Sequence, residues 1–188
     1  GTNLANADLR GIDLSGSLLD GVKFSGADLS RSELSNASFQ GAMVEGANLR
    51  RADLAGADLR EVDLRSLDLS RVNLEGAAID ANANWSGIVL ENVDLEGVDL
   101  RGINLSGAQL RGVNLRGANL TGANLTGTLF EDVDLRQANL QGATLVDTTF
   151  ALTSFNEANL AGARLENITL DRSRLCRAIL VDGGTPEC

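Results

Sequence analysis

The chain has 188 residues, no histidine and no tyrosine, one tryptophan and one proline, and a formal net charge of −10. Its apolar fraction of 43% is ordinary for a globular protein, and no apolar run approaches the length of about 18 residues that a membrane-spanning helix needs. The negative charge argues against general binding to nucleic acid or to anionic lipid, since both are polyanions.

From Leu4 to Ile79, a bulky apolar residue recurs at every fifth position, which we call the central position. The residue two before it is small or β-branched, the residue just before it is usually Asp or Asn, and the residue two after it is usually Gly. A period of five fits neither a helix nor a strand. Because glycine accepts positive φ, a glycine in most units predicts a corner in each unit. One small and one large side chain per unit would then fill an interior.

The pattern shifts by one residue at 80–82, resumes with Trp85 at a central position, and runs to Leu180. An extra residue kept in the wall would turn every later side chain to the wrong face. We therefore expect one residue to bulge outward at a corner, as a tolerated insertion or as a binding protrusion or bend: Asp80, Ala81 or Asn82. Four units would close a square coil of 20 residues, and the 16 units before the shift and 20 after it would make nine coils.

The two ends of the pattern differ. The first coil already contains Leu4 and shows no cap, so we expect this end to stack on a second copy, or a preceding segment to have been removed. Residues 182–188 leave the pattern and are expected to fold over the last coil as a capping tail.

The unit A-D/N-L-x-G, repeated over residues 2–181, resembles the pentapeptide-repeat family. The resemblance implies an all-β fold, a right-handed quadrilateral parallel β-helix of about nine four-sided coils. Residues 1–181 would then form one domain, interrupted only by the shift at 80–82. The C-terminal stretch "RLCRAILVDGGTPEC" is similar to the tails of cyanobacterial and plant-lumen members, which carry a Leu-Cys, a later Asp-Gly and a final Cys.

The chain has two cysteines, Cys176 and Cys188. Cys176 follows a central residue and should point outward, and the tail could bring Cys188 back to it. A capping disulfide is favoured over two free thiols, and the similarity of the tail supports it. Such a bond would place the protein in an oxidising compartment, the periplasm or a thylakoid lumen, with the cytoplasm as the alternative.

Catalysis is not expected. The chain lacks histidine and a Cys-x-x-Cys metal motif, and its many carboxylates, such as Asp53 and Asp58, occupy one fixed position of the repeat. Glycine-rich strings read as corners, since no helix follows them to bind phosphate. The sequence therefore predicts neither an enzyme nor a cofactor or metal.

Surface charge is the remaining feature. Because residues 20 apart share a column, one wall carries five arginines: Arg10, Arg31, Arg50, Arg51 and Arg71. The next wall carries an acidic set: Asp13, Glu33, Asp53, Asp94 and Asp134. These walls are interpreted either as solvated mixed-charge surfaces or as a flat docking surface anchored by arginines, which favour interfaces.

Two functions remain. The first is a non-enzymatic rod that acts as a protein-interaction scaffold for an unidentified protein, with no nucleic acid partner and no membrane insertion. The second comes from the resemblance, because some members of the family mimic a DNA duplex and bind or inhibit DNA gyrase. The acidic balance is compatible with it, but this chain has Leu rather than Phe at most centres and lacks a dimerising C-terminal helix and projecting loops.

Overall fold

The computed structural model of the protein describes residues 1–181 and 183–187 and divides the chain into two compact units. The first unit comprises Gly1–Asp80 and the second comprises Ala81–Cys188. The boundary falls within residues 80–82, so it coincides with the interruption of the five-residue pattern.

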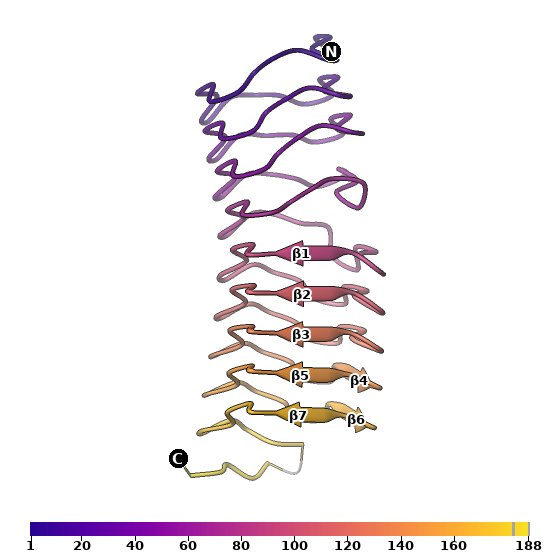
Figure 1. The fold of residues 1–188 in the computed structure, drawn as a ribbon, viewed down its shortest axis with the longest axis vertical. Helices are drawn as coiled ribbons and strands as arrows, with labels where there is room; N and C mark the ends of the chain where they lie inside the picture. Colours follow the sequence, from indigo (N-terminus) through magenta and orange to yellow (C-terminus); the bar gives the residue numbers. More distant parts are fainter. Residues whose placement is uncertain (182, 188) are drawn as a thin grey trace. The chain divides into compact units, whose positions relative to one another are not determined.

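The first unit is a stack of four-sided coils in which most sides pair with the side 20 residues later (Figure 1). One parallel bridge per side joins the first coil to the second: Asn3 to Lys23, Asp8 to Asp28, Asp13 to Glu33, and Leu18 to Ser38. The amide of Leu9, for example, donates to the carbonyl of Asp28 at 2.8 Å. Each five-residue unit is therefore one side of a coil, as the sequence predicts.

The second unit repeats this arrangement, and parts of its walls are regular strands (Figure 1). A five-stranded parallel sheet comprises β1 (Val89–Glu91), β2 (Gln109–Arg111), β3 (Leu129–Glu131), β5 (Thr149–Ala151) and β7 (Thr169–Asp171). On the adjoining side, β4 (Thr144–Val146) pairs in parallel with β6 (Arg164–Glu166). Leu90 aligns with Leu110 and Leu110 with Phe130, so the register is again 20 residues.

Most coils turn at the residue two after a central position, where φ is positive. Gly26 has φ 69°, and the same left-handed conformation is held by Arg31 at 60° and Asn36 at 58°. The following amide often closes the turn on the central carbonyl, as Ala27 does on Phe24 at 2.8 Å. Glycine accepts this backbone without steric cost, whereas other residues lose roughly 1–2 kcal/mol.

The core consists of the central side chains and the small side chains two residues before them. Leu115 and Ala118 have no exposed surface, and Trp85 is only 3% exposed at its predicted central position. Phe150 packs against Phe130 and Phe155 with ring centroids 4.8 Å apart in both pairs. Each fully buried leucine contributes about 1.5–3 kcal/mol, so the stability comes from many similar contacts between neighbouring coils.

At some of the small inward positions the side chain carries a hydroxyl group, and two such threonines form hydrogen bonds to the backbone. Thr128 donates to the carbonyl of Leu105 at 2.7 Å, and Thr148 donates to that of Leu125 at 2.8 Å, each in the preceding coil. A buried hydroxyl is costly without such a partner. Threonine can therefore replace alanine at this position without leaving a buried hydroxyl group that lacks a hydrogen-bond partner.

The interruption has a simple local structure, in which Asp80 is the extra residue. Asn82 forms the corner with φ 61°, and its amide donates to the carbonyl of Arg101 at 3.0 Å. The half-buried Asp80 accepts a hydrogen bond from the amide of Glu61 on its carboxylate at 2.8 Å. In a regular coil this amide position donates to a backbone carbonyl, as Arg51 does to Ser70. A functional role for this bulge stays a prediction.

The predicted fold class is confirmed: the described residues form stacked, parallel, four-sided coils with strands and no helix, although the coil count differs from the predicted nine. The coils fall into two compact units, Gly1–Asp80 and Ala81–Cys188. A single domain over residues 1–181 stays a prediction.

The terminal coils are less buried than the others. Leu4, Leu9 and Leu14 are half-buried, whereas Leu29 and Leu34 in the next coil have no exposed surface. After the last coil, the carbonyls of Pro186 and Gly184 accept hydrogen bonds from the amides of Arg177 at 2.9 Å and Leu180 at 2.8 Å. In the middle of the stack, the next coil supplies the carbonyls that accept from such amides, and here the tail supplies them. The capping role of the tail stays a prediction.

Candidate functional site

Three of the predicted arginines, Arg31, Arg51 and Arg71, form one corner of the first unit, which we call the arginine column. Their φ values are 60°, 61° and 62°, and all three residues are exposed. The amide of Arg31 donates to the carbonyl of Arg50 at 3.0 Å, and that of Arg51 to Ser70 at 3.2 Å, so the corners stack. Since adjacent parallel strands lie about 4.8 Å apart, the three side chains start at that spacing.

The other two predicted arginines lie on the wall beside this corner and are paired there. Arg10 donates to Asp8 at 2.7 and 2.8 Å and lies 3.9 Å from Asp28, whereas Arg50 lies 3.4 Å from Asp68. The Arg10 side-chain hydrogen bonds lower the pKa of Asp8 to about 2. The wall arginines are therefore paired with carboxylates of their own wall.

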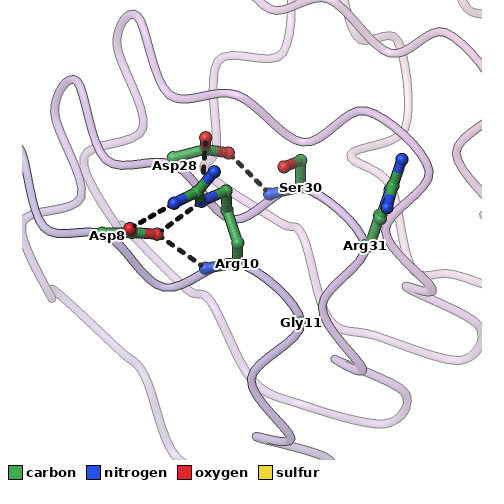
Figure 2. A pocket seen from close by; sticks show the side chains of 6 residues that line it. All are labelled: Asp8, Arg10, Gly11, Asp28, Ser30 and Arg31. Atoms are coloured by element: carbon green, nitrogen blue, oxygen red, sulfur yellow. Dashed lines mark hydrogen bonds and ion pairs between the residues drawn. The ribbon is translucent and has the colours of Figure 1, made fainter.

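Figure 2 shows this difference at a shallow hollow on the first unit. Asp8, Arg10 and Asp28 converge on one another, and Arg31 lies apart from them at the corner. Within the described residues, the side chains of Arg31, Arg51 and Arg71 make no ion pair or hydrogen bond. The structure thus brings the five predicted arginines together but separates them into a paired wall and an unpaired column.

The acidic set is likewise assembled within each unit. In the first unit, parallel backbone bridges join Asp13 to Glu33 and Glu33 to Asp53 along one wall, and we call these three residues the acidic column. Asp53 accepts hydrogen bonds from Asn73 at 3.0 Å and Ser35 at 2.9 Å. A hydrogen bond from the backbone amide of Ser15 lowers the pKa of Asp13.

The remaining two acidic residues belong to the second unit. Asn114 bridges to both Asp94 and Asp134, so these two share one wall. Burial raises the pKa of Asp134, but hydrogen bonds from Arg136 outweigh it and leave that pKa lowered. A single acidic wall running through both units stays a prediction.

Sequence reasoning missed a local pattern that separates most wall arginines of the first unit from the arginine column. In the string Asp-Leu-Arg, the two charged residues flank a central leucine on the outer face of one side of a coil, as in Asp58–Arg60, where the separation is 2.5 Å, and Asp63–Arg65, where it is 2.8 Å. In the string Asp-Leu-Ser-Arg, the arginine stands one residue later in the repeat, at the corner position, and this is the case for Arg31 and Arg71. This one-residue difference was visible in the sequence.

Other classes of site find no support in the part of the chain that the structure describes. Across residues 1–181 and 183–187, no three His, Cys, Asp or Glu side chains are grouped so that they could hold a metal ion. Over the same residues, no helix has the length and apolar character needed to cross a membrane.

The predicted disulfide finds no support either. Cys176 is a half-buried free thiol, and Cys188 lies outside the described residues. The extracytoplasmic location that we inferred from this bond stays a prediction.

Comparison with known proteins addresses the family. A family model for pentapeptide repeats matches the chain in eight copies, over residues 1–36, 45–78, 81–112, 114–151, 134–172 and 153–182. Comparison with curated proteins gives no match.

Among solved structures, the chain is similar to HetL, a pentapeptide repeat protein involved in heterocyst differentiation regulation in the cyanobacterium Nostoc. The identity is 32% over 98% of this chain and 78% of HetL, with a TM-score of 0.53. A pentapeptide repeat protein from the Arabidopsis thaliana thylakoid lumen is 35% identical over 62% of this chain and 66% of its own, with a TM-score of 0.28. The plasmid-mediated fluoroquinolone resistance protein QnrB1 is 17% identical over 99% and 88% of the two chains, with a TM-score of 0.48. With its five-residue repeat, its four-sided coils, the match to the family model and the similarity to HetL, the chain belongs to the pentapeptide-repeat family.

Proposed function

We propose that the protein is a non-enzymatic scaffold that docks a protein partner along the arginine column. The observation that carries this proposal is that Arg31, Arg51 and Arg71 lack an ion pair within the described residues, whereas the wall arginines beside them are paired. An unpaired guanidinium can bind a carboxylate of a partner in bidentate fashion. Each of the three also holds a left-handed backbone, and no side-chain ion pair or hydrogen bond within the described residues offsets its cost.

The carboxylates support binding rather than acid–base chemistry. Asp53 accepts hydrogen bonds from Asn73 and from the amide of Ala55, and Asp13 accepts one from the amide of Ser15. These bonds are repeated features of the coil walls and fix the orientation of the carboxylates.

The test is a binding measurement with a purified partner. Proteins captured by the wild type would be identified, purified and titrated against the wild type and against R31A/R51A/R71A. We expect the triple variant to lose at least about tenfold in affinity, because interface arginines are frequent hot spots. A control, R101A/R111A/R164A, removes three arginines that are paired on walls of the second unit and should bind as the wild type does. Equal affinity of the wild type and R31A/R51A/R71A would overturn the proposal.

A DNA-duplex mimic that binds DNA gyrase is the second candidate, favoured by the net charge of −10 and the acidic column. It predicts inhibition in a gyrase supercoiling assay that disappears when the acidic residues of both units are neutralised: Asp13, Glu33, Asp53, Asp94 and Asp134. The arginine column beside the acidic column is unlike a phosphate backbone, and therefore the scaffold is placed first. Inhibition that depends on those five residues would reverse this order.

A further inference from the structure

We propose that the protein associates side by side with a second copy of itself, with the arginine column of each copy facing the acidic column of the other. This inference rests on the proposed docking role of the arginine column and names a partner for it. It concerns the first unit only.

The two columns are adjacent and share one spacing. Arg31 and Glu33 lie two residues apart on one coil, and Arg51 and Asp53 lie two residues apart on the next. The bridge from Glu33 to Asp53 and the stacked corners of Arg31 and Arg51 hold both columns at one residue per coil, about 4.8 Å apart. A positive stripe therefore runs beside a negative stripe in the same register.

Both columns lack a counter-ion within the described residues. The Glu33 side chain makes no ion pair or hydrogen bond there, and Asp53 accepts only from neutral donors, which are Ser35, Asn73 and the amide of Ala55. The arginine column is unpaired as well. The charges are thus available to an external partner on both stripes.

A two-fold axis parallel to the coil stack and lying between the stripes would place opposite charges face to face. Such an axis keeps each coil at the height of the same coil in the second copy. Arg31 of one copy then faces Glu33 of the other, Arg51 faces Asp53, and symmetry repeats both contacts. Self-complementary interfaces of this kind are the commonest in homo-oligomers.

The shared period favours a second copy over other acidic partners. Acidic residues on one face of an extended strand repeat at about 6.6 Å, and one turn of a helix rises about 5.4 Å. Either repeat falls out of step with columns spaced at about 4.8 Å. A second β-helix of the same kind matches them along the whole contact.

The association is expected to be weak. Exposed ion pairs contribute little individually, and two chains of net charge −10 repel each other. We therefore expect a dissociation constant of about 1 mM. At about 0.15 M salt the general repulsion is screened beyond about 8 Å, whereas ion pairs in direct contact persist.

The experiment is a charge swap followed by sedimentation of the full chain at that salt concentration. R31E/R51E makes both stripes negative, and E33R/D53R makes both positive. The affinity of each variant for itself should be lower than that of the wild type by about tenfold or more, because all four contacts become repulsive. An equimolar mixture of the two should associate as the wild type does, since every contact is again between opposite charges. Circular dichroism confirms folding, and Glu61 already holds positive φ at a corner, so glutamate fits the corner backbone.

Net charge alone gives the opposite ranking. R31E/R51E moves the charge from −10 to −14 and E33R/D53R moves it to −6, so a general charge effect would make E33R/D53R the strongest self-associating form. R172E/R174E in the second unit also gives −14 and should leave self-association unchanged. A monomeric wild type at about 1 mM, strong association of E33R/D53R alone, or a mixture that stays monomeric would each overturn the inference. None of these results bears on binding to a different protein, which the triple variant R31A/R51A/R71A tests separately.

Discussion

At the scale of single residues, the corner position shows why some glycines cannot be replaced. In four places an asparagine with positive φ in one coil lies against a glycine in the next: Asn6 with Gly26, Asn36 with Gly56, Asn82 with Gly102, and Asn92 with Gly112. A Cβ added to Gly102 would lie 2.0 Å from Oδ1 of Asn82 and 3.0 Å from its Cγ. Glycine here supplies space as well as backbone freedom.

Gly102 and Gly117 form a matched pair for testing this contact. Both have φ +65°, but a Cβ at Gly117 would meet nothing within 4 Å. Alanine at either site carries a backbone penalty of about 1 kcal/mol, and G102A should cost about 1 kcal/mol more because Asn82 must move. Chemical denaturation measures the difference, and N82G/G102A should remove it. Equal destabilisation by G102A and G117A would show that the asparagine yields freely.

The arginine column gives a second prediction at this scale. Arg51 is exposed, and its side chain is unpaired within the described residues. Because alanine holds the same φ of 61° with the same strain, R51A should change the free energy of unfolding by less than about 0.5 kcal/mol. Thermal denaturation provides the measurement. A drop of several degrees would mean that the column maintains the fold and is not kept for a partner.

At the scale of the element, burial changes between coils that have similar sequences. Leu115 has no exposed surface, whereas Leu170, at the same position of the repeat in β7, is 44% exposed. The pattern of the sequence does not distinguish them. What differs is whether a further coil covers the side chain.

This contrast predicts unequal costs for one substitution. L115A should lower the free energy of unfolding by about 2–5 kcal/mol, because it leaves a cavity between covered coils. L170A should cost about 1 kcal/mol, since much of that side chain already meets water. Urea denaturation of both variants is the measurement. Similar losses would mean that another segment covers Leu170 in solution.

The repeat predicts most of this architecture, and it does so through particular residues. Leu115 and Ala118 are inward because the five-residue spacing leaves two inward positions per side, and Trp85 marks where the pattern resumes. The spacing could not show that Asp80 is the extra residue, since its bond to the amide of Glu61 depends on three-dimensional placement. Grouping Arg10 with Arg31 on one wall overlooked a difference that the sequence does contain, since Arg10 comes one residue after a central leucine and Arg31 comes two residues after one.

At the scale of the whole molecule, the Asp–Arg pairs couple stability to pH. The side-chain hydrogen bonds of Arg10 and Arg65 lower the pKa values of Asp8 and Asp63 to about 2 each. In the unfolded chain an aspartate titrates near 3.9, about two units higher. Because the folded value is the lower one, these pairs add stability above pH of about 4, and that stability is lost as the pH falls toward about 2.

The melting temperature should therefore be nearly constant above pH of about 5 and should fall between about 4 and about 2. In R10A/R65A the pKa values of Asp8 and Asp63 return toward the ordinary range. The melting temperature of this variant should therefore fall less than that of the wild type over the same pH interval. Calorimetric scans at a series of pH values compare the two proteins. Parallel curves for wild type and variant would show that these pairs do not contribute to acid unfolding.

The 20-residue register also determines how such a protein can change its length over generations. Loss of residues 41–60 would remove one coil of the first unit, leave every later side chain on its own wall, and bring Arg71 next to Arg31. Loss of five residues would move each later side chain to the neighbouring wall and break both charged stripes. Duplication or deletion of whole coils can thus lengthen or shorten a recognition stripe in a single genetic event, with no redesign of the core.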